Sequence, residues 1–420
     1  MTELDPSAAA PSRWAVVWRP FEHRNYRLFF AGQLVSLVGT WTQSVAQTWL
    51  VYTLTHSAFW LGVATFCQQA PVFFLATVGG SIADRHKRRS VLVMTQTSAM
   101  TLAFTLAALT LTHVVHVGHI LVLAGLLGVV NAVDIPTRQS FIVEMVGREH
   151  LMNAVALNST MVNGARILGP ALAGFAIKAF GEGWCFVVNG VSFLAVIAGL
   201  LAMRGLPAPA AAPEKESMLS RVLEGFRFAA RHARVRAVLL VFAVTALSAV
   251  PYSTLLPVFA SGVFHGDAQT LGWLMGSGGA GAVCGALLLG SRGTLRRPFH
   301  WIAAACALFG VGLVLFAQST TLWLSMLLLV PVGAGMMMQM TAINTLVQTL
   351  TPDALRGRVI AIWAMIFMGF APFGAIMAGS LSGAIGPART LMIGGSVCLA
   401  GALGFARWVW TAKPSSEREA

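Results

Sequence analysis

Long apolar stretches separated by short polar turns run through almost the whole sequence. Each has about 20 residues or more, and a helix of that length crosses the hydrocarbon core of a bilayer. The stretches fall at residues 28–52, 57–82, 90–112, 118–143, 153–178, 184–204, 237–263, 269–291, 299–318, 321–347, 357–384 and 388–410. The pattern therefore predicts an all-α membrane protein with twelve transmembrane helices.

Composition supports this prediction and narrows it. Hydrophobic residues make up 56% of the 420 residues and charged residues only 10%, so the chain is too apolar to keep a water-soluble surface. The net charge is +13, but nearly all Lys and Arg fall near the termini or in alternate turns, as the positive-inside rule requires. We expect a multi-pass protein of the plasma (inner) membrane with both termini cytoplasmic. Its basic charge then faces anionic lipid, not nucleic acid.

One long break divides the chain into two halves. The stretch Leu206–Pro213 is rich in Pro and Ala and cannot continue a helix. After it, Leu219, Val222, Leu223 and Phe226 recur at helical spacing, which predicts an amphipathic helix on the cytoplasmic leaflet. We expect a cytoplasmic N-terminal segment at 1–27, a six-helix bundle at 28–204, a cytoplasmic linker at 205–236, a second bundle at 237–410 and a cytoplasmic tail at 411–420.

A glycine repeat relates the two halves. Gly164, Gly169 and Gly174 lie five residues apart, and Gly369, Gly374 and Gly379 reproduce this spacing 205 positions later. Small residues let transmembrane helices approach closely, and Pro170 sets a bend beside Gly169. We expect Gly164, Gly169, Pro170 and Gly174 to form a helix-packing motif.

A charged turn lies between the second and third stretches. It contains Gly80, Asp84, Arg85, Arg88 and Arg89. This spacing resembles the loop between helices 2 and 3 of the major facilitator superfamily, although Lys87 stands where that family usually has a second glycine. The resemblance implies two six-helix bundles related by pseudo-two-fold symmetry, with the substrate site between them and this turn as a gating loop. The second-half counterpart, Gly290–Arg297, keeps the basic residues and loses the acid.

Two further stretches narrow the resemblance. Gly169-Pro170 resembles the glycine-proline motif in helix 5 of the superfamily's antiporters. The stretch from Asn131 to Gln139, leading to Glu144, resembles the branch that contains the bacterial enterobactin exporter and related efflux proteins. The arginine that many drug-proton antiporters carry in helix 4 is absent, because Ala124 stands before Gly128.

Polar side chains recur at helical spacing inside three of the apolar stretches. Gln33, Ser36, Thr40, Gln43 and Gln47 form one stripe, Thr245, Ser248 and Tyr252 a second, and Thr341, Asn344 and Gln348 a third. Lipid does not tolerate such a face, so each stripe either bonds to another helix or lines a water-filled cavity. We expect these stripes to line the substrate path.

Two charged residues lie deep in predicted helices. Asp134 is the candidate for proton coupling, because an antiporter needs a group that changes protonation. Arg138 lies one turn away, so a structural ion pair is the alternative. Arg166 has no acidic neighbour at its depth and either bonds helix carbonyls or binds an anionic or catechol-bearing substrate.

The sequence carries no phosphate-binding loop and no hydrolase or zinc-protease motif. We therefore expect no enzymatic activity, no cofactor and no metal site, with membrane lipid, a small-molecule substrate and protons as partners of a monomer. The function we expect is a secondary active transporter that exports small amphipathic, siderophore-like or drug-like molecules by alternating access, as a proton-coupled antiporter. The alternatives are an ion-coupled uptake symporter and a non-transporting receptor or assembly factor on the same scaffold.

Overall fold

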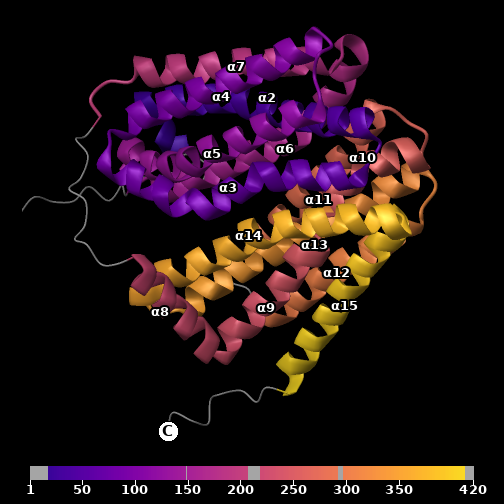
Figure 1. The fold of residues 1–420 in the computed structure, drawn as a ribbon. Coiled ribbons are helices and arrows are strands. Elements are labelled where there is room, and N and C mark those ends of the chain that lie inside the picture. The colour runs from indigo at the N-terminus through magenta and orange to yellow at the C-terminus, as the bar shows by residue number, and fades with distance from the viewer. Residues whose placement is uncertain (1–17, 148, 207–217, 292–296, 412–420) are drawn as a thin grey trace, which may run out of the picture.

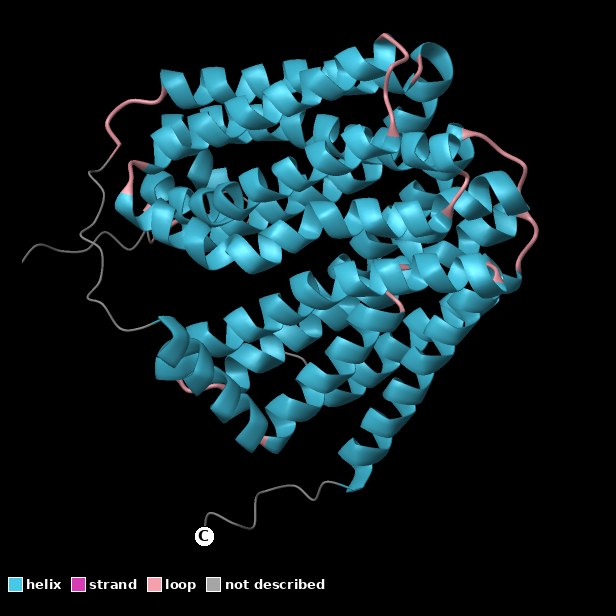
Figure 2. Cartoon of the chain, in the orientation of Figure 1, coloured by secondary structure: helices cyan, strands magenta, loops and turns pink. Residues whose placement is uncertain are grey.

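The computed structural model describes residues 18–147, 149–206, 218–291 and 297–411, and these residues form helices joined by short loops (Figure 2). In the first half, a 3₁₀ turn at Arg19–Glu22 precedes α2 (Arg24–Thr55), α3 (Ala58–Arg85), α4 (Arg88–Leu111), α5 (Val117–Val146), α6 (Leu151–Phe180) and α7 (Glu182–Ala202). After α8 (Met218–Arg231), the second half contains α9 (Ala233–Ser248), α10 (Tyr252–Val258), a π-helical turn at Phe259–Val263, α11 (Ala268–Gly290), α12 (Pro298–Gln318), α13 (Leu322–Leu350), α14 (Asp353–Ile385) and α15 (Pro387–Thr411).

The predicted all-α membrane class is confirmed. Within the described residues, 10 helices are long and apolar enough to cross a membrane, and the segment Ala233–Val263 counts as one of them. The other two predicted spans coincide with α2 and α6, which have 32 and 30 residues but carry several polar side chains. Twelve spans are therefore consistent with the structure, and the two helices outside the ten carry the first polar stripe (α2) and Arg166 (α6).

The long helices pack into two groups (Figure 1). In the first group α2 packs on α6 and α7, α3 on α5, and α4 on α5 and α7. In the second group α11 packs on α13, α12 on α13 and α15, and α9 on α14 and α15. The two bundles meet mainly through two helix pairs, α3 with α14 and α6 with α11.

The contact between the bundles is concentrated at one end. Gly62 and Gly379 face the opposite bundle in the first half of α3 and the second half of α14, and Gly174 and Gly272 do so in α6 and α11. From these contacts the bundles diverge toward the end that carries the α3–α4 turn, α8 and the end of α15 (Figure 1). We name this the linker end, and the opposite one the far end.

The glycine repeat has a spatial counterpart. A Cβ added at Gly169 would lie 2.3 Å from Trp41 Cβ of α2, and one at Gly374 would lie 2.3 Å from the Leu247 carbonyl of α9, the first long helix of the other bundle. Five residues further along the chain, Gly174 contacts α11 and Gly379 contacts α3. Two of the three glycine pairs thus contact equivalent partner helices, which is what a repeat of two similar bundles requires. The third pair does not, since an added Cβ would meet Phe73 at Gly369 and nothing within 4 Å at Gly164.

Two glycines singled out in the sequence do not allow a close approach. A Cβ added at Gly80 or at Gly164 would meet nothing within 4 Å. In the charged turn the close approach belongs to Gly79, where an added Cβ would lie 1.9 Å from the Ala132 carbonyl of α5. The expectation that Gly164 serves helix packing is therefore wrong, because no other helix lies close enough to contact it.

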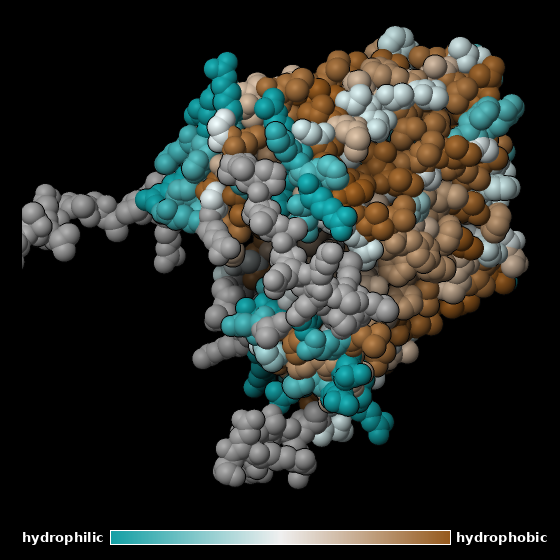
Figure 3. Space-filling model, turned by 60° about the vertical axis from the view of Figure 1, so that its left-hand side comes forward, coloured by the Kyte–Doolittle hydropathy of each residue, from teal (hydrophilic) through white to brown (hydrophobic). Residues whose placement is uncertain are grey.

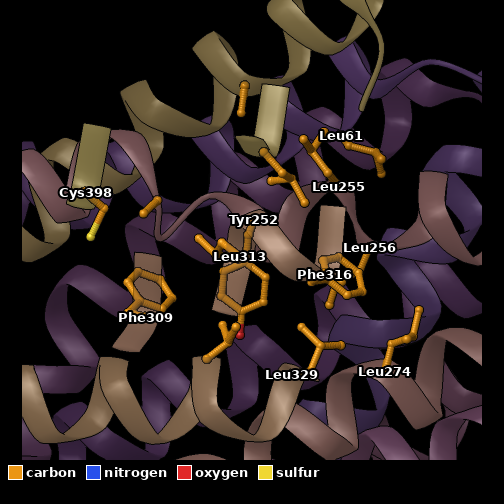
Figure 4. Close-up of a cluster of buried hydrophobic side chains, with 14 of the residues drawn as sticks. Leu61, Tyr252, Leu255, Leu256, Leu274, Phe309, Leu313, Phe316, Leu329 and Cys398 are labelled. Carbon is orange, nitrogen blue, oxygen red and sulfur yellow. The ribbon is translucent and has the colours of Figure 1, made fainter. Parts of the chain in front are cut away.

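Large apolar side chains fill the second bundle. Tyr252 packs edge-on against Phe309 with ring centroids 6.0 Å apart, and Leu313 and Phe316 lie beside it (Figure 4). In the same bundle, the thiols of Cys306 and Cys398 lie 3.3 Å apart as free cysteines. These cysteines are fully buried, as expected for packing residues.

The linker helix predicted from the sequence is present as α8. Its small residues Gly225 and Ala229 are buried, and Glu224 pairs with Arg358 of α14. Leu223 and Phe226 are exposed. Residues 207–217 of the linker lie outside the described residues, and the side chains of Leu219 and Val222 are not described either. Figure 3, turned to bring the linker end forward, shows hydrophilic residues gathered there beside a hydrophobic flank.

Candidate functional site

A cavity of about 360 Å³ lies between the two bundles, and we name it the central cavity. The first bundle lines it with Trp41, Gln68, Gln69, Arg166 and Pro170, and the second bundle with Tyr252, Met275, Met336, Met337, Met340 and Phe367, among others. Methionine side chains are flexible and polarisable, so they adapt to ligands of different shape, and the aromatic rings offer stacking surfaces. The lining therefore suits a molecule with a large apolar or aromatic part.

Arg166 carries the positive charge of the central cavity. Its guanidinium carbon lies 5.6 Å from the ring centroid of Trp41, which is within the range of a cation–π contact. No carboxylate belongs to the described residues that line this cavity. Because an unpaired cation in a membrane interior is costly, the site favours a ligand that brings negative charge.

A second cavity, of about 210 Å³, lies inside the first bundle, and we name it the polar chamber. It is lined by the whole first stripe and by polar residues of four other helices: Gln33, Ser36, Thr40, Gln43, Gln47, Gln68, Gln96, Asn131, Asp134, Arg138 and Asn189. Trp41, Ser44 and Gln68 line both cavities, so the two are neighbours. The stripe also bonds to a neighbouring helix, since the Asn189 amide donates to Gln43 at 2.8 Å.

Asp134 lies in the wall of the polar chamber and is only 3% exposed. Its Oδ1 accepts from Thr95 Oγ1 and from Gln96 Nε2, both at 2.8 Å. Its Oδ2 lies 3.4 Å from Arg138, which also donates to Gln33 of α2 at 3.1 Å. The carboxylate is thus held by two neutral donors and one cation, and the ion pair with Arg138 is formed.

The charged turn joins two helices of the first bundle. Arg88 lies 3.7 Å from Asp84 and also pairs with Glu144 of α5. The side chain of Asp84 is 53% exposed. Its turn lies at the linker end, where α3 and α14 have separated (Figure 1). Arg85 is also exposed, and Arg89 donates to the Leu201 carbonyl at the end of α7 at 2.7 Å. The counterpart turn, 292–296, is outside the described residues.

The other predicted path residues are scattered. Tyr252 lines the central cavity, but Thr245 is 1% exposed and bonds within its own bundle, accepting from Gln339 at 3.1 Å. Ser248 donates to the Val244 carbonyl of its own helix at 2.6 Å. Thr341, Asn344 and Gln348 line neither cavity, and Gln348 donates to Asn344 one turn away.

Sequence reasoning missed several residues of both cavities. Gln68-Gln69 is an amide pair inside an apolar stretch, and Thr95-Gln96 is another polar pair inside the next one. These pairs do not form helical stripes, so the periodicity of polar positions does not reveal them. The methionines of α13 carried no signal either, because methionine in an apolar helix is ordinary packing material.

Together these features define a membrane transporter of the two-bundle type, with a small-molecule cavity where the bundles meet. The chain belongs to the transmembrane secretion effector family, whose model matches residues 15–417, within the major facilitator superfamily. It is therefore a transporter and not an enzyme.

Named relatives cover nearly the whole chain. The staphyloferrin A transporter of Staphylococcus aureus is 25% identical over 381 residues, which cover 89% of this chain and 94% of the relative. The enterobactin exporter EntS of Escherichia coli is 25% identical over 378 residues, 89% of each chain.

Solved structures have the same fold. A bacterial homologue of the iron transporter ferroportin in its inward-facing state matches with a TM-score of 0.70 at 15% identity, over 92% of this chain and 98% of that one. A POT family transporter in complex with 5-aminolevulinic acid matches with a TM-score of 0.72 at 10% identity, over 92% and 96%.

Proposed function

We propose that this chain exports small, amphipathic, anionic molecules of the siderophore type, in exchange for protons and by alternating access. The observation that carries the proposal is Arg166, a cation set among methionine and aromatic side chains in a cavity without described carboxylates. A siderophore-like anion would pair its charge with Arg166 and place its apolar part on Trp41 and the methionines. The names of two relatives, a staphyloferrin A transporter and an enterobactin exporter, support the same substrate class.

The proposed orientation puts the linker end in the cytoplasm. The charged turn with Arg85, Arg88 and Arg89 lies at this end, and cytoplasmic loops carry the excess of basic residues. In this orientation both termini are cytoplasmic, and the divergence of the bundles opens the substrate path inward. The gating loop would act in the opposite state, when Asp84 of α3 meets the start of α14.

Proton coupling is assigned to Asp134. It is the one buried carboxylate among the described residues, and its hydrogen-bond network reaches α2 through Arg138 and Gln33. Protonation would remove the charge that holds Arg138, so the contact between α5 and α2 would depend on the proton. The polar chamber, next to the central cavity, offers a route for water between Asp134 and the substrate.

The test is transport by the purified protein in vesicles with an imposed pH gradient. We expect a catechol-bearing anion to move against its gradient, and Arg166→Gln to lower this transport by about ten-fold or more, since a lost charged contact costs about 1.5–3 kcal/mol. Arg166→Lys should retain part of the activity because the charge remains. Full transport of anions by a folded Arg166→Gln protein would refute anion recognition, and transport that ignores the pH gradient would refute antiport.

A further inference from the structure

We propose that a pocket at the linker end of the first bundle binds the phosphate headgroup of an anionic phospholipid. The pocket has a volume of about 720 Å³ and lies where α4 begins, α5 ends and α7 ends. It is separate from the central cavity and the polar chamber, with which it shares no lining residue. Its function does not depend on which substrate is transported.

The pocket is basic. Lys87, Arg88, Arg89 and Arg204 line it, and Glu144 is its one described acid. Glu144 pairs with Arg88, so three cations remain without a carboxylate partner among the described residues that line the pocket. Basic pockets between transmembrane helices on the cytoplasmic side are suited to anionic headgroups.

One buried donor in the pocket wall has no acceptor. The Nε atom of Arg88 is buried and makes no hydrogen bond, although the same guanidinium bonds Glu144 through Nη1. A buried, charged donor without an acceptor is unfavourable, and a phosphate oxygen is a suitable partner for it. Arg89, which uses Nη2 on the Leu201 carbonyl, keeps further N–H groups for the same ligand.

The rest of the pocket wall identifies the ligand as a lipid. Val93, Phe141, Leu201 and Met203 line it beside the basic residues. Leu201 is also 58% exposed on the outer face of α7, where Val188, Val191 and Leu194 continue an exposed apolar surface toward the membrane interior. A headgroup in the pocket would therefore have its acyl chains on a surface already suited to lipid, whereas a free phosphate would leave that surface unused.

The test compares phosphatidylglycerol with phosphatidylcholine of the same acyl chains, bound to the purified full-length protein and counted by native mass spectrometry. We expect the wild-type chain to prefer phosphatidylglycerol about ten-fold and the Lys87→Gln/Arg204→Gln variant to lose most of this preference, since each basic residue near the surface contributes on the order of a five-fold gain. Arg407→Gln removes an exposed cation from the same end of the other bundle and serves as the matched control. It should retain the preference.

Several outcomes would overturn the proposal. An unchanged preference in the double variant, or in the single variant Arg204→Gln if the double variant does not fold, would remove the basic pocket from lipid binding. Thermal stabilisation by inorganic phosphate equal to that by the lipid would identify a small-anion site instead. If phosphatidylglycerol is preferred only after Glu214→Gln/Glu216→Gln, the carboxylates of these two linker residues occupy the pocket in the wild-type protein instead of a lipid.

Discussion

The two bundles share a frame of glycine contacts but differ in what their interiors hold. In the first bundle a polar chamber contains Asp134, Arg138 and a row of amides. In the second bundle the buried polar cluster is neutral, made of Thr245, Gln339 and two thiols. The second bundle also supplies all the methionines of the central cavity. We propose from this comparison that the two bundles have different tasks: the first holds the charged groups, and the second supplies most of the apolar surface for a ligand.

The difference is physically reasonable for a two-bundle transporter. A buried charge is stable only where partners surround it, and Asp134 has its partners on α4 and on its own helix α5, both of the first bundle. Moving one bundle against the other therefore does not break these contacts. The contacts that must change lie between bundles, and there the structure uses small residues and short-range packing.

The largest expected effect is that of Asp134→Asn. We expect pH-driven transport to fall by about 100-fold, because the amide cannot exchange a proton and the only buried described carboxylate is lost. Transport down a substrate gradient at a fixed pH should persist. The measurement is vesicle uptake with and without a pH gradient.

A matched change in the second bundle sharpens this result. Gln339→Leu removes a buried neutral amide that donates to Thr245, and should lower thermal stability by about 1–3 kcal/mol while the response to the pH gradient stays. If Asp134→Asn keeps its pH-driven transport, the Asp134–Arg138 contact is a structural ion pair and the division between the bundles fails.

The second prediction tests the shared frame. Gly174→Leu and Gly379→Leu should each slow transport by about ten-fold, because overpacking a tight contact costs about 1–3 kcal/mol and prevents the far end from closing. An added Cβ would lie 2.9 Å from Gln269 Cα at the first site and 2.5 Å from the Ala58 carbonyl at the second. The measurement is the initial rate of transport at equal protein content.

Gly164→Ala and Gly383→Ala are the controls, since both positions face open space. Their rates should stay within about two-fold of wild type. Unequal effects of Gly174→Leu and Gly379→Leu would show that the two contacts between bundles are not equivalent.

The sequence predicts features that depend on one segment of the chain better than features that depend on how several helices pack together. The helices follow from apolar length alone, and the 205-residue repeat gave the glycines that meet equivalent partners. Which residues line the polar chamber depends on how five helices rotate about their axes, and the length of an apolar stretch does not determine this rotation. For the same reason the sequence does not show that Gly79 makes the close contact with α5 or that Thr245 is buried within its own bundle. Arg166 and Asp134 stand out in the sequence because charge is rare in an apolar helix, whereas Thr95 and Gln96, the neutral partners of Asp134, do not.

The third prediction concerns the acid that only the first charged turn has. Asp84→Asn should slow transport by about three- to ten-fold while abundance stays normal, because the carboxylate would hold α3 to the start of α14 only when the linker end is closed. In the present conformation it lies 3.7 Å from Arg88, its one ion-pair partner among the described residues, and is half exposed, so its loss should cost little stability. The check is turnover per folded protein. A normal rate would remove Asp84 from gating and make the two turns functionally alike.

The smallest effect is expected at the far end, where the two contacts between bundles differ. Lys178 of α6 lies 3.3 Å from Asp267, which precedes α11, and donates to Gln269 at 3.2 Å. In the equivalent contact of α14 with α3, Gly383 corresponds to Lys178 and Ser57 corresponds to Asp267. Although partial burial alone would raise the pKa of Asp267, the backbone N–H groups of Thr270 and Gln269 together with Lys178 outweigh it and lower that pKa. The stabilisation of the far-end contact by the Lys178–Asp267 pair is therefore complete above the ordinary carboxyl pKa. It is lost only as the pH falls through the lowered pKa of Asp267.

Lys178→Gln should shift the balance between the two conformations by up to about five-fold toward opening of the far end, because exposed ion pairs contribute about 1 kcal/mol or less. Spin labels at exposed far-end positions 180 and 323, in a background without the five native cysteines, would measure that balance as two distance populations. Asp267→Asn should give a similar shift, and the double variant no more than either alone, since both remove the same contact. The shift caused by Lys178→Gln should be the same at about pH 5 and at about pH 8, because the lowered pKa keeps Asp267 ionised throughout this range. Additive shifts in the double variant would mean that Lys178 and Asp267 act separately. The ion pair would then not distinguish the α6–α11 contact from the α14–α3 contact in energy.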